Sequence, residues 1–386
     1  MKNFDLSERL KGITPYLFAE IDRKKSALRK KKVKFTDLSI GDPDLKVPGG
    51  VVKALYRESS VKANQKYAMD RGNPVLRGAI RQWFLKRFGV KLSEDTQILP
   101  LLGSKEGLVH FPLAAVNRGD YVLIPSPGYP GYRSAAILSG GRVCDLPLLA
   151  KNGFLPDLKK IPERVRNKAK LMYLNYPNNP TTALASAEFL QKLVKFCSKY
   201  GIILAYDNAY SEIYFEEKPL SVLQIKGAEE IALEFHSFSK TFCMTGFRLG
   251  WACGNSALIK MLLKVKSNID SGVFTAMQLA GAQALKKEKS YVDMLRKTFK
   301  ERRDIFVSGI KEDGFTALYA DSTFYVWAKI PSAYKGSMEF AEHLLLSKKI
   351  VATPGIGFGK YGEGFIRFAL TVDKDILGKV IKRKIC

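Results

Sequence analysis

The chain has 386 residues, and 46% of them are hydrophobic, so it can bury a large core and its length suggests two or three domains. No apolar run reaches the roughly 18 residues that a membrane span needs, and the first residues lack the apolar segment of a secretory signal. The five cysteines form no CxxC pair and the three histidines have no ligand spacing, which predicts reduced thiols in a cytoplasmic protein and argues against a metal site.

The net charge of +26 would suit a polyanion or an acidic small molecule as a partner. The densest basic run, from Arg23 to Lys34, lies on a predicted N-terminal helix with Leu17, Phe18 and Ile21 on its other face. We interpret this run as a solvated helix face, because aromatic side chains do not interleave with the basic ones as a single-strand binding groove requires. Binding of nucleic acid is therefore not expected.

The first third of the chain predicts an arm and helix up to residue 34, a strand over 36–40, and helices over 49–60 and 74–88. Between these two helices lies Tyr67, for which packing is a simpler interpretation than a hydroxyl that binds phosphate. A strand over 96–102 then leads into Gly103-Ser104-Lys105, which opens an apolar helix. Such a helix start offers free N–H groups to an anion, but strand–glycine–helix junctions are also common for steric reasons.

The middle of the chain alternates between strands and helices. This rhythm predicts a mostly parallel sheet covered by helices, with sites at the carboxyl ends of its strands. Polar loops follow three of the strands, at 126–130, 175–181 and 207–210. Asp207 follows an apolar strand and precedes Tyr210 by three residues; its alternative role is to cap a following helix. The predicted strands cover 121–125, 142–146, 170–175 and 202–206, and the helices 132–138 and 187–200.

The stretch from His236 to Arg248 predicts a strand, a turn that carries Lys240, and a return strand over 247–253. Two serine hydroxyls and a guanidinium in this stretch suit a phosphate. The amine suits a covalent link to an aldehyde, because burial and nearby positive charge lower the pKa of a lysine and free its lone pair. From this stretch alone, an exposed turn lysine and a surface arginine are an equally good interpretation.

The last third predicts a small α+β domain, with the N-terminal arm as its companion. Arg367 lies inside a predicted strand, and a half-buried arginine there needs an anionic partner, either a structural or a substrate carboxylate. We expect residues 1–45 to form the arm and part of the small domain, 46–285 the large domain and 286–386 the small domain. The predicted helices cover 255–267, 274–286, 289–311 and 337–347, and the strands 323–329, 350–353 and 365–370.

Taken together, these stretches resemble the fold-type I aminotransferases, which use pyridoxal 5'-phosphate, over nearly the whole chain. Within that family the motifs are most similar to those of the LL-diaminopimelate aminotransferases. The motifs are Pro-Tyr-Leu-Phe-Ala-Glu-Ile (15–21), Ser-Ile-Gly-Asp-Pro-Asp (39–44), Tyr-Pro-Asn-Asn-Pro-Thr (176–181), Phe-His-Ser-Phe-Ser-Lys-Thr (235–241), Met-Thr-Gly-Phe-Arg-Leu-Gly (244–250), Lys-Ser-Asn-Ile-Asp-Ser-Gly-Val-Phe (266–274) and Gly-Glu-Gly-Phe-Ile-Arg (362–367).

The resemblance implies an α/β fold with a three-layer αβα large domain and a smaller α+β domain, assembled as a cytoplasmic homodimer with shared active sites. It implies transamination between LL-diaminopimelate or tetrahydrodipicolinate and glutamate or 2-oxoglutarate, in lysine biosynthesis. The alternatives are an aspartate, alanine or aromatic aminotransferase of the same subgroup and a β-C–S lyase. From a different class, the alternative is a nucleic-acid-binding regulator with an aminotransferase-like body.

The resemblance also implies a role for individual residues. Lys240, Asp207 and Tyr210 would carry the chemistry: Lys240 would bind the cofactor covalently and then move a proton, Asp207 would pair with the protonated pyridine nitrogen, and Tyr210 would bond the phenolic oxygen together with Asn179. The other cofactor-binding positions are Ser104, Lys105, Tyr129, Ser237, Ser239 and Arg248, with Tyr67 from the partner subunit. The substrate-binding positions are Tyr16, Gly41, Asp70, Asn179, Ser271 and Arg367.

Two positions depart from the family pattern. Thr182 stands where the family usually has glycine, so the loop backbone there is expected to differ. Asp70 stands where some members have a glutamate that contacts the distal amine of diaminopimelate.

Overall fold

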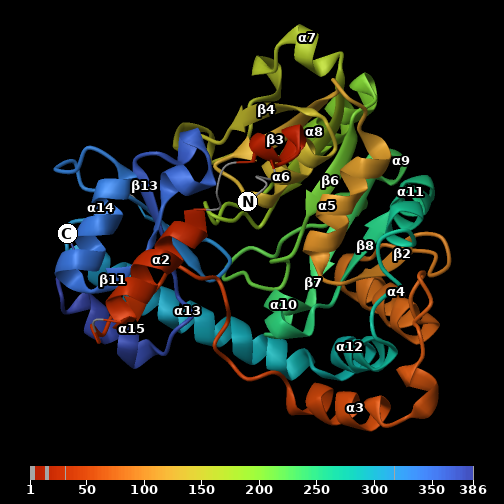
Figure 1. The fold of residues 1–386 in the computed structure, drawn as a ribbon, viewed down its shortest axis with the longest axis horizontal. Coiled ribbons are helices and arrows are strands. Elements are labelled where there is room, and N and C mark those ends of the chain that lie inside the picture. The colour runs from red at the N-terminus through yellow and green to blue at the C-terminus, as the bar shows by residue number, and fades with distance from the viewer. Residues whose placement is uncertain (1–4, 14–16, 31, 317, 386) are drawn as a thin grey trace.

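The computed structural model of the protein describes residues 5–13, 17–30, 32–316 and 318–385. Within these residues, seven strands form one sheet in the order β2-β8-β7-β6-β5-β3-β4 (Figure 1). Neighbouring strands from β7 to β4 are all parallel, whereas β8 is antiparallel to both β7 and β2. The strands are β2 (Ile98–Leu101), β3 (Tyr121–Ser126), β4 (Arg142–Pro147), β5 (Ala169–Asn175), β6 (Ile203–Asp207), β7 (Ala232–Ser237) and β8 (Gly250–Gly254).

Helices cover both faces of this sheet, because its strands are apolar on both sides and have to be buried on both. One face packs against α3 (Gly49–Ser59), α4 (Pro74–Phe88), α8 (Ala187–Tyr200) and α12 (Thr275–Lys287). The other face packs against α5 (Ser104–Ala115), α6 (Gly131–Leu138) and α11 (Ser256–Lys266). Three short helices, α7 (Glu163–Arg166), α9 (Ala228–Ile231) and α10 (Phe238–Thr241), lie in the connections. The predicted α/β fold with a mostly parallel sheet is confirmed.

A second, smaller body contains an antiparallel sheet in the order β12-β13-β10-β9 and a parallel pair of β1 with β11. The pair joins the N-terminal segment to the C-terminal third of the chain, as the red and blue ribbons show (Figure 1). The strands are β1 (Thr36–Asp37), β9 (Leu318–Tyr319), β10 (Tyr325–Lys329), β11 (Ile350–Val351), β12 (Thr353–Pro354) and β13 (Phe365–Ala369).

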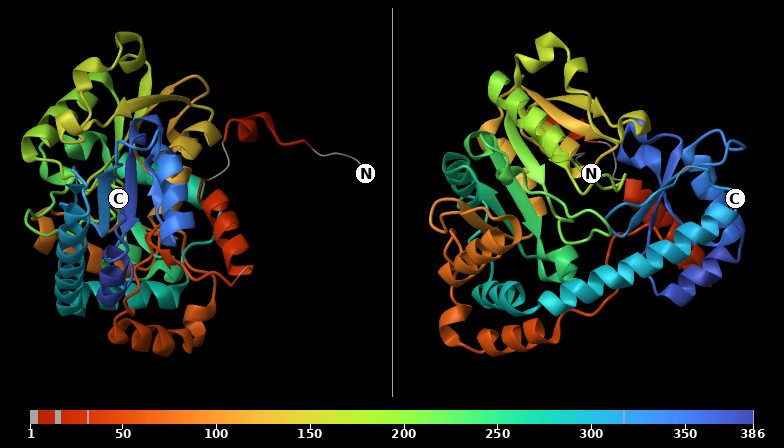
Figure 2. Two further views of the ribbon diagram at one scale, coloured as in Figure 1. Left: turned by 90° about the vertical axis from the view of Figure 1, so that its left-hand side faces the viewer. Right: turned by 180° about the vertical axis from the view of Figure 1, so that it is seen from behind.

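The long helix α13 (Lys289–Glu312) runs from the layers of the large sheet to this smaller body (Figure 2). Its apolar side chains Phe306 and Ile310 enter the core of the smaller body, together with residues of α14 (Ser337–His343) and α15 (Lys374–Ile381). The N-terminal helices are α1 (Glu8–Lys11), which contacts α6, and α2 (Leu17–Lys30). None of the helices in the described part of the chain has both the length and the apolar composition needed to cross a membrane.

Several predicted elements are shorter than expected. The strand predicted over 36–40 covers two residues, and the strand predicted over 350–353 is divided between β11 and β12, which belong to different sheets. The predicted helix 337–347 is α-helical to His343 and then continues as a π-helix over Leu344–Lys348. The strand predicted from residue 323 begins at Tyr325, because Thr323 has a φ of 65°.

The basic run near the N-terminus is not entirely solvated. Helix α2 ends at Lys30, and Lys25 within the run is only 3% exposed. The Lys25 ammonium lies 2.8 Å from the Asp37 carboxylate of β1. One member of the run therefore anchors the N-terminal helix to the strand pair.

Candidate active site

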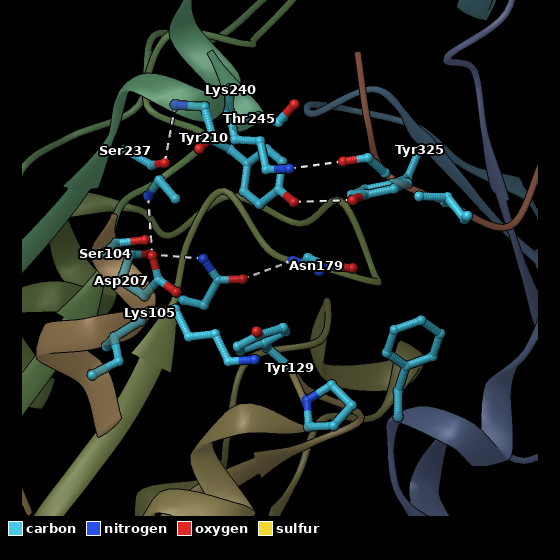
Figure 3. Close-up of a pocket in the computed structure, with 18 of the residues that line it drawn as sticks. Ser104, Lys105, Tyr129, Asn179, Asp207, Tyr210, Ser237, Lys240, Thr245 and Tyr325 are labelled. Carbon is cyan, nitrogen blue, oxygen red and sulfur yellow. Dashed lines mark hydrogen bonds between the residues drawn. The ribbon is translucent and has the colours of Figure 1, made fainter. Parts of the chain in front are cut away.

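A cavity of about 420 Å³ opens at the carboxyl ends of the central strands, and side chains from both bodies line it (Figure 3). It brings together twelve of the residues that the sequence predicted as a site. These are Gly41, Ser104, Lys105, Tyr129, Asn179, Asp207, Tyr210, Ser237, Ser239, Lys240, Arg248 and Arg367. Residues separated by more than 300 positions in the chain thus meet, because strand ends and the loops that follow them gather at one edge of the large sheet, and Arg367 faces them from within β13.

Lys240 lies in the one-turn helix α10, directly after β7, and not in a plain turn as predicted. Its Nζ donates a hydrogen bond to the carbonyl oxygen of Gly41 at 2.7 Å. The pKa of Lys240 is lowered from 10.5 to about 8, mainly by burial; Asp42 opposes this shift, and the positive charges of Arg367 and Arg248 contribute to it. Lys240 is only partly exposed and lines the cavity, so the alternative of an exposed turn lysine is wrong.

Asp207 is the last residue of β6 and is buried. Its Oδ2 accepts a hydrogen bond of 2.6 Å from the hydroxyl of Tyr132, and its Oδ1 accepts one of 3.1 Å from the backbone N–H of Ala209. Burial raises the pKa of Asp207, and the bond from Tyr132 opposes that rise. No helix follows Asp207 in the described residues before Val222, so the helix-capping alternative is wrong. A buried carboxylate facing a cavity suits a cationic ligand group.

The wall of the cavity near α5 has the chemistry of a phosphate site. Helix α5 begins at Ser104 after Gly103, which has a φ of 81°. A Cβ on Gly103 would lie 2.5 Å from Nη2 of Arg248, so only glycine leaves room for the guanidinium at the helix start. Ser237 and Ser239 add hydroxyls at the end of β7. N–H groups at a helix start, hydroxyls and a guanidinium together match a phosphate dianion.

The position of Arg248 differs from the prediction. The return strand β8 begins at Gly250, so Arg248 precedes it, with a left-handed φ of 53°. Its Nη1 donates to the carbonyl oxygen of Thr245 at 2.9 Å. The strained backbone turns the side chain toward the cavity rather than into the sheet.

Arg367 of β13 is 2% exposed and lines the opposite side of the cavity. Its Nη1 donates to Oδ1 of Asn179 and its Nη2 to the carbonyl oxygen of Ser39, both at 2.7 Å. Its guanidinium lies 4.1 Å from the ring centroid of Tyr325. The Tyr325 hydroxyl lies 3.0 Å from that of Tyr210. These contacts hold the guanidinium in one orientation, as recognition of a planar carboxylate requires.

Three predicted site residues lie outside the cavity, and a fourth is not described. Tyr67 is 93% exposed, so it does not pack within its own chain. It lines a shallow surface hollow together with Ser271, and Asp70 belongs to the same loop as Tyr67. Tyr16 lies outside the described residues.

The sequence reasoning missed four lining or supporting residues. Tyr132 bonds the Asp207 carboxylate from α6, and Tyr325, Thr245 and Phe358 line the cavity. Thr245 lies inside a motif that carried the resemblance, which was an available signal. No sequence signal pointed to Tyr132 and Tyr325, because apolar neighbours along a helix or strand do not reveal where a hydroxyl points.

The family of this chain follows from a comparison of sequences. Residues 33–383 match the family model described as aminotransferase class I and II. The chain belongs to this family. An LL-diaminopimelate aminotransferase of Aquifex aeolicus is 47% identical over 381 residues, which cover 98% of each chain. A substrate-bound BacF structure from Bacillus subtilis is 33% identical, with a TM-score of 0.96 over 99% of this chain and 98% of the other. A single mutant of Thermus thermophilus aspartate aminotransferase is 27% identical, with a TM-score of 0.93 over 99% of each chain.

Aminotransferases of this family use pyridoxal phosphate, and the chemistry of this cavity fits that cofactor. The residues around Gly103 and Arg248 suit its phosphate, and the Asp207 carboxylate suits its protonated ring nitrogen. The Lys240 amine, with a pKa of about 8, suits its aldehyde. The enzyme is therefore a pyridoxal-phosphate-dependent aminotransferase whose small-molecule substrates are amino acids and keto acids.

Proposed function

We propose that this enzyme transfers an amino group reversibly between glutamate and tetrahydrodipicolinate, the keto-acid precursor of LL-diaminopimelate, in lysine biosynthesis. One observation carries the proposal: the Lys240 amine and the Arg367 guanidinium meet in one cavity, in a chain whose relatives at 47% and 45% identity are named LL-diaminopimelate aminotransferase. An amine that moves protons beside an arginine that binds a carboxylate is the arrangement that an α-amino acid needs.

Pyridoxal phosphate supplies an aldehyde that takes up amino groups and a ring that withdraws electrons from the substrate α-carbon. In our proposal, Asp207 stays ionised and holds the ring nitrogen in its protonated form. The bonds that Asp207 accepts from Tyr132 and Ala209 keep its carboxylate in one orientation. Tyr210 and Asn179 would hold the phenolic oxygen, and Tyr129 would support the ring; all three line the cavity.

The phosphate would be held by the N–H groups at Ser104 and Lys105, the Ser237 and Ser239 hydroxyls, and Arg248. These groups come from two neighbouring strand ends and one helix start, so they are already placed before the phosphate arrives. Because these donors are already in place, little rearrangement of the protein is needed when the phosphate binds.

Lys240 has two tasks in the proposal. Its neutral Nζ would hold the cofactor covalently through the aldehyde carbon. As a free amine, the same Nζ would move the proton of the substrate α-carbon, because a base with a pKa of about 8 is well matched to proton transfer near neutral pH. The bond from Nζ to the Gly41 carbonyl oxygen holds the free amine at the cavity wall.

Arg367 would bind the substrate α-carboxylate through both of its terminal nitrogens, together with Asn179 and the Gly41 backbone. Lys105 lines the same cavity, and its ammonium suits the distal carboxylate, together with Tyr16. Asp70 and Ser271 do not line the cavity of their own chain, so in the proposal they would contribute through a second subunit.

We also propose a homodimer in which each chain completes the cavity of the other. The surface around Tyr67 exposes several large apolar side chains, and a second copy would cover them. They are Tyr56, Tyr67, Met69, Ile269 and Phe274, which are 81%, 93%, 60%, 53% and 44% exposed. We place the enzyme in the cytoplasm, because Cys144, Cys197, Cys243 and Cys253 are all free thiols.

The experiment that tests the proposal is a substrate panel with the purified, cofactor-loaded enzyme. LL-diaminopimelate with 2-oxoglutarate should give the highest kcat/KM, against aspartate, alanine, aromatic amino acids and a cysteine conjugate as the lyase substrate. Turnover of another amino donor without turnover of diaminopimelate would refute the substrate assignment and leave the aminotransferase class intact.

A further inference from the structure

A buried group of charges connects α5 with the loop that follows α11. Lys266, the last residue of α11, is 0% exposed. Its Nζ donates to Oδ1 of Asp270 at 2.6 Å and lies 3.1 and 3.2 Å from the two carboxylate oxygens of Glu106. A buried ammonium between two carboxylates is held firmly, because removing Lys266 would leave two neighbouring carboxylates without a compensating charge. None of these residues has a role in the chemistry proposed above.

Glu106 links this group to the phosphate wall of the cavity. It lies two residues after Ser104 in the first turn of α5, and its Oε2 also accepts a 2.5 Å bond from the backbone N–H of Leu102. Leu102 and Ser104 flank Gly103, whose left-handed backbone leaves room for Arg248. The Glu106 side chain therefore spans the turn that presents the helix N–H groups to the cavity.

Asp270 links the same group to the exposed surface. Its Oδ1 also accepts a 2.8 Å bond from the backbone N–H of Gly272, which shapes the turn over 270–272. Gly272 has a φ of 83°, and a Cβ there would lie 2.9 Å from the carbonyl oxygen of Met69. The turn thus packs closely against the loop that carries Tyr67, and both loops line the same hollow.

A metal ion is a weaker interpretation of this cluster. Ligand-type atoms of Glu106, His110 and Asp270 lie within 4.8 Å of one another. However, the Lys266 ammonium already contacts both carboxylates and supplies the positive charge that they need. The group has the chemistry of an internal ion pair.

We propose that Lys266 is a positioning residue that acts on two active sites at once. Through Glu106 it fixes the phosphate wall of its own chain, and through Asp270 it fixes the loops of residues 67–70 and 270–272. This inference rests on the proposed homodimer, in which those loops complete the cavity of the neighbouring subunit. Lys266 would then couple the cofactor site of one chain to the part that the same chain contributes to its neighbour.

Hybrid dimers test separately the effect of Lys266 on the site of its own chain and its effect on the site of the neighbouring subunit. Each hybrid has one chain with Lys240→Ala, so only the other chain can show the visible absorbance of lysine-bound cofactor. In the first hybrid, Lys266→Met lies on the chain that keeps Lys240 and alters that site's own wall. In the second, Lys266→Met lies on the Lys240→Ala chain and alters only the loops contributed to the working site. Lys264→Met, on the exposed face of the same helix, is the matched control in both.

We expect the dissociation constant of pyridoxal phosphate, from the absorbance titration, to rise at least about 10-fold in both hybrids relative to their Lys264→Met controls. An increase in only one hybrid would overturn the coupling, because the ion group would then serve a single site. No increase in either would overturn the positioning role.

Two further measurements address a variant that does not fold and the oligomeric state of the chain. Should the Lys266→Met chain fail to fold, Glu106→Gln, which keeps the side-chain size, replaces it in the same hybrids, with the exposed Glu188→Gln as its control. Sedimentation of the unmodified chain distinguishes the two proposals. A monomer overturns both the homodimer and the coupling, whereas a dimer whose hybrids match their controls overturns the coupling alone.

Discussion

The central cavity and the surface hollow around Tyr67 differ in how their polar groups are used. In the cavity, Lys240, Asp207 and Arg367 each have partners within their own chain, and burial changes the pKa of Lys240 and of Asp207. In the hollow, Tyr67 and Ser271 lie at an exposed surface. Both regions carry residues that the family resemblance assigns to one active site.

In the proposed homodimer, a single chain preorganises the chemical centre, and the second chain completes the site. Side chains at adjacent strand ends are fixed by the sheet itself. Side chains on surface loops acquire a function only when another surface covers them, since an exposed hydroxyl binds water in preference to a ligand. The following predictions address the two regions, from the largest expected effect to the smallest.

Lys240→Ala should lower turnover by about 10⁴-fold or more, because it removes both the amine that holds the cofactor and the base that moves the proton. The visible absorbance of lysine-bound cofactor should also disappear. Reduction of the loaded enzyme with borohydride and peptide mapping would show whether the cofactor is attached elsewhere. Attachment through another lysine would contradict the assignment.

Arg367→Lys should lower kcat/KM by about 100-fold, mainly through KM, because an ammonium cannot make the two parallel bonds that a guanidinium makes to a carboxylate. Steady-state kinetics with both substrates measures the effect. Arg81→Lys, on the exposed face of α4, is the control. Equal kinetics for the two variants would remove Arg367 from the substrate site.

The attachment of cofactor to the apo chain should speed up with pH and level off above about 8. Only the neutral amine attacks an aldehyde, and burial lowers the pKa of Lys240 to about 8, so below that value the rate should fall about tenfold per pH unit. Stopped-flow absorbance measures this rate. An apparent pKa near 10.5, the ordinary value for lysine, would mean that the amine is not buried in solution.

Tyr67→Phe should raise the dissociation constant of pyridoxal phosphate by about 10-fold, through loss of one charge-assisted hydrogen bond from the neighbouring subunit. The free energy of unfolding should change by less than about 0.5 kcal/mol, because the side chain is 93% exposed in its own chain. Cofactor titration and urea unfolding provide the two measurements. Unchanged cofactor affinity would mean that Tyr67 of the neighbouring subunit does not contribute to cofactor binding.

Thr182→Gly should lower the free energy of unfolding by about 1 kcal/mol less than Thr181→Gly does. Thr181 is the matched control, because both threonines are fully buried. Thr182 has a φ of 65°, a conformation that glycine adopts without strain, whereas Thr181 has no positive φ. The Thr182 side chain also accepts a hydrogen bond from the Asp321 N–H at 3.2 Å. Losing this bond offsets part of the backbone strain that Thr182→Gly relieves. Equal costs in urea unfolding would show that the loop backbone carries no strain.

The prediction of individual elements succeeded where periodicity was strong. The helices α3, α4 and α8 end within two residues of their predicted limits, since their apolar faces and their start and end residues are local signals. At the short strands β1, β11 and β12 the prediction failed, because such strands exist only through pairing with partners distant in sequence. The departure at Thr182 was visible in the sequence, and the structure gives this residue a φ of 65°, a conformation that favours glycine. The expectation that the loop backbone differs from that of the family stays a prediction.

The family, the cofactor and the residue types of the site could be inferred from the sequence, because the ordered motifs from residue 15 to residue 367 resemble those of one family over nearly the whole chain. Only the tertiary structure decided that the Tyr132 hydroxyl bonds Asp207, that Tyr325 joins Tyr210 to Arg367, and that Lys266 lies buried between two carboxylates. The physical reason is that a side chain's direction and burial depend on what packs against it from distant segments, and one-dimensional patterns carry no record of those contacts.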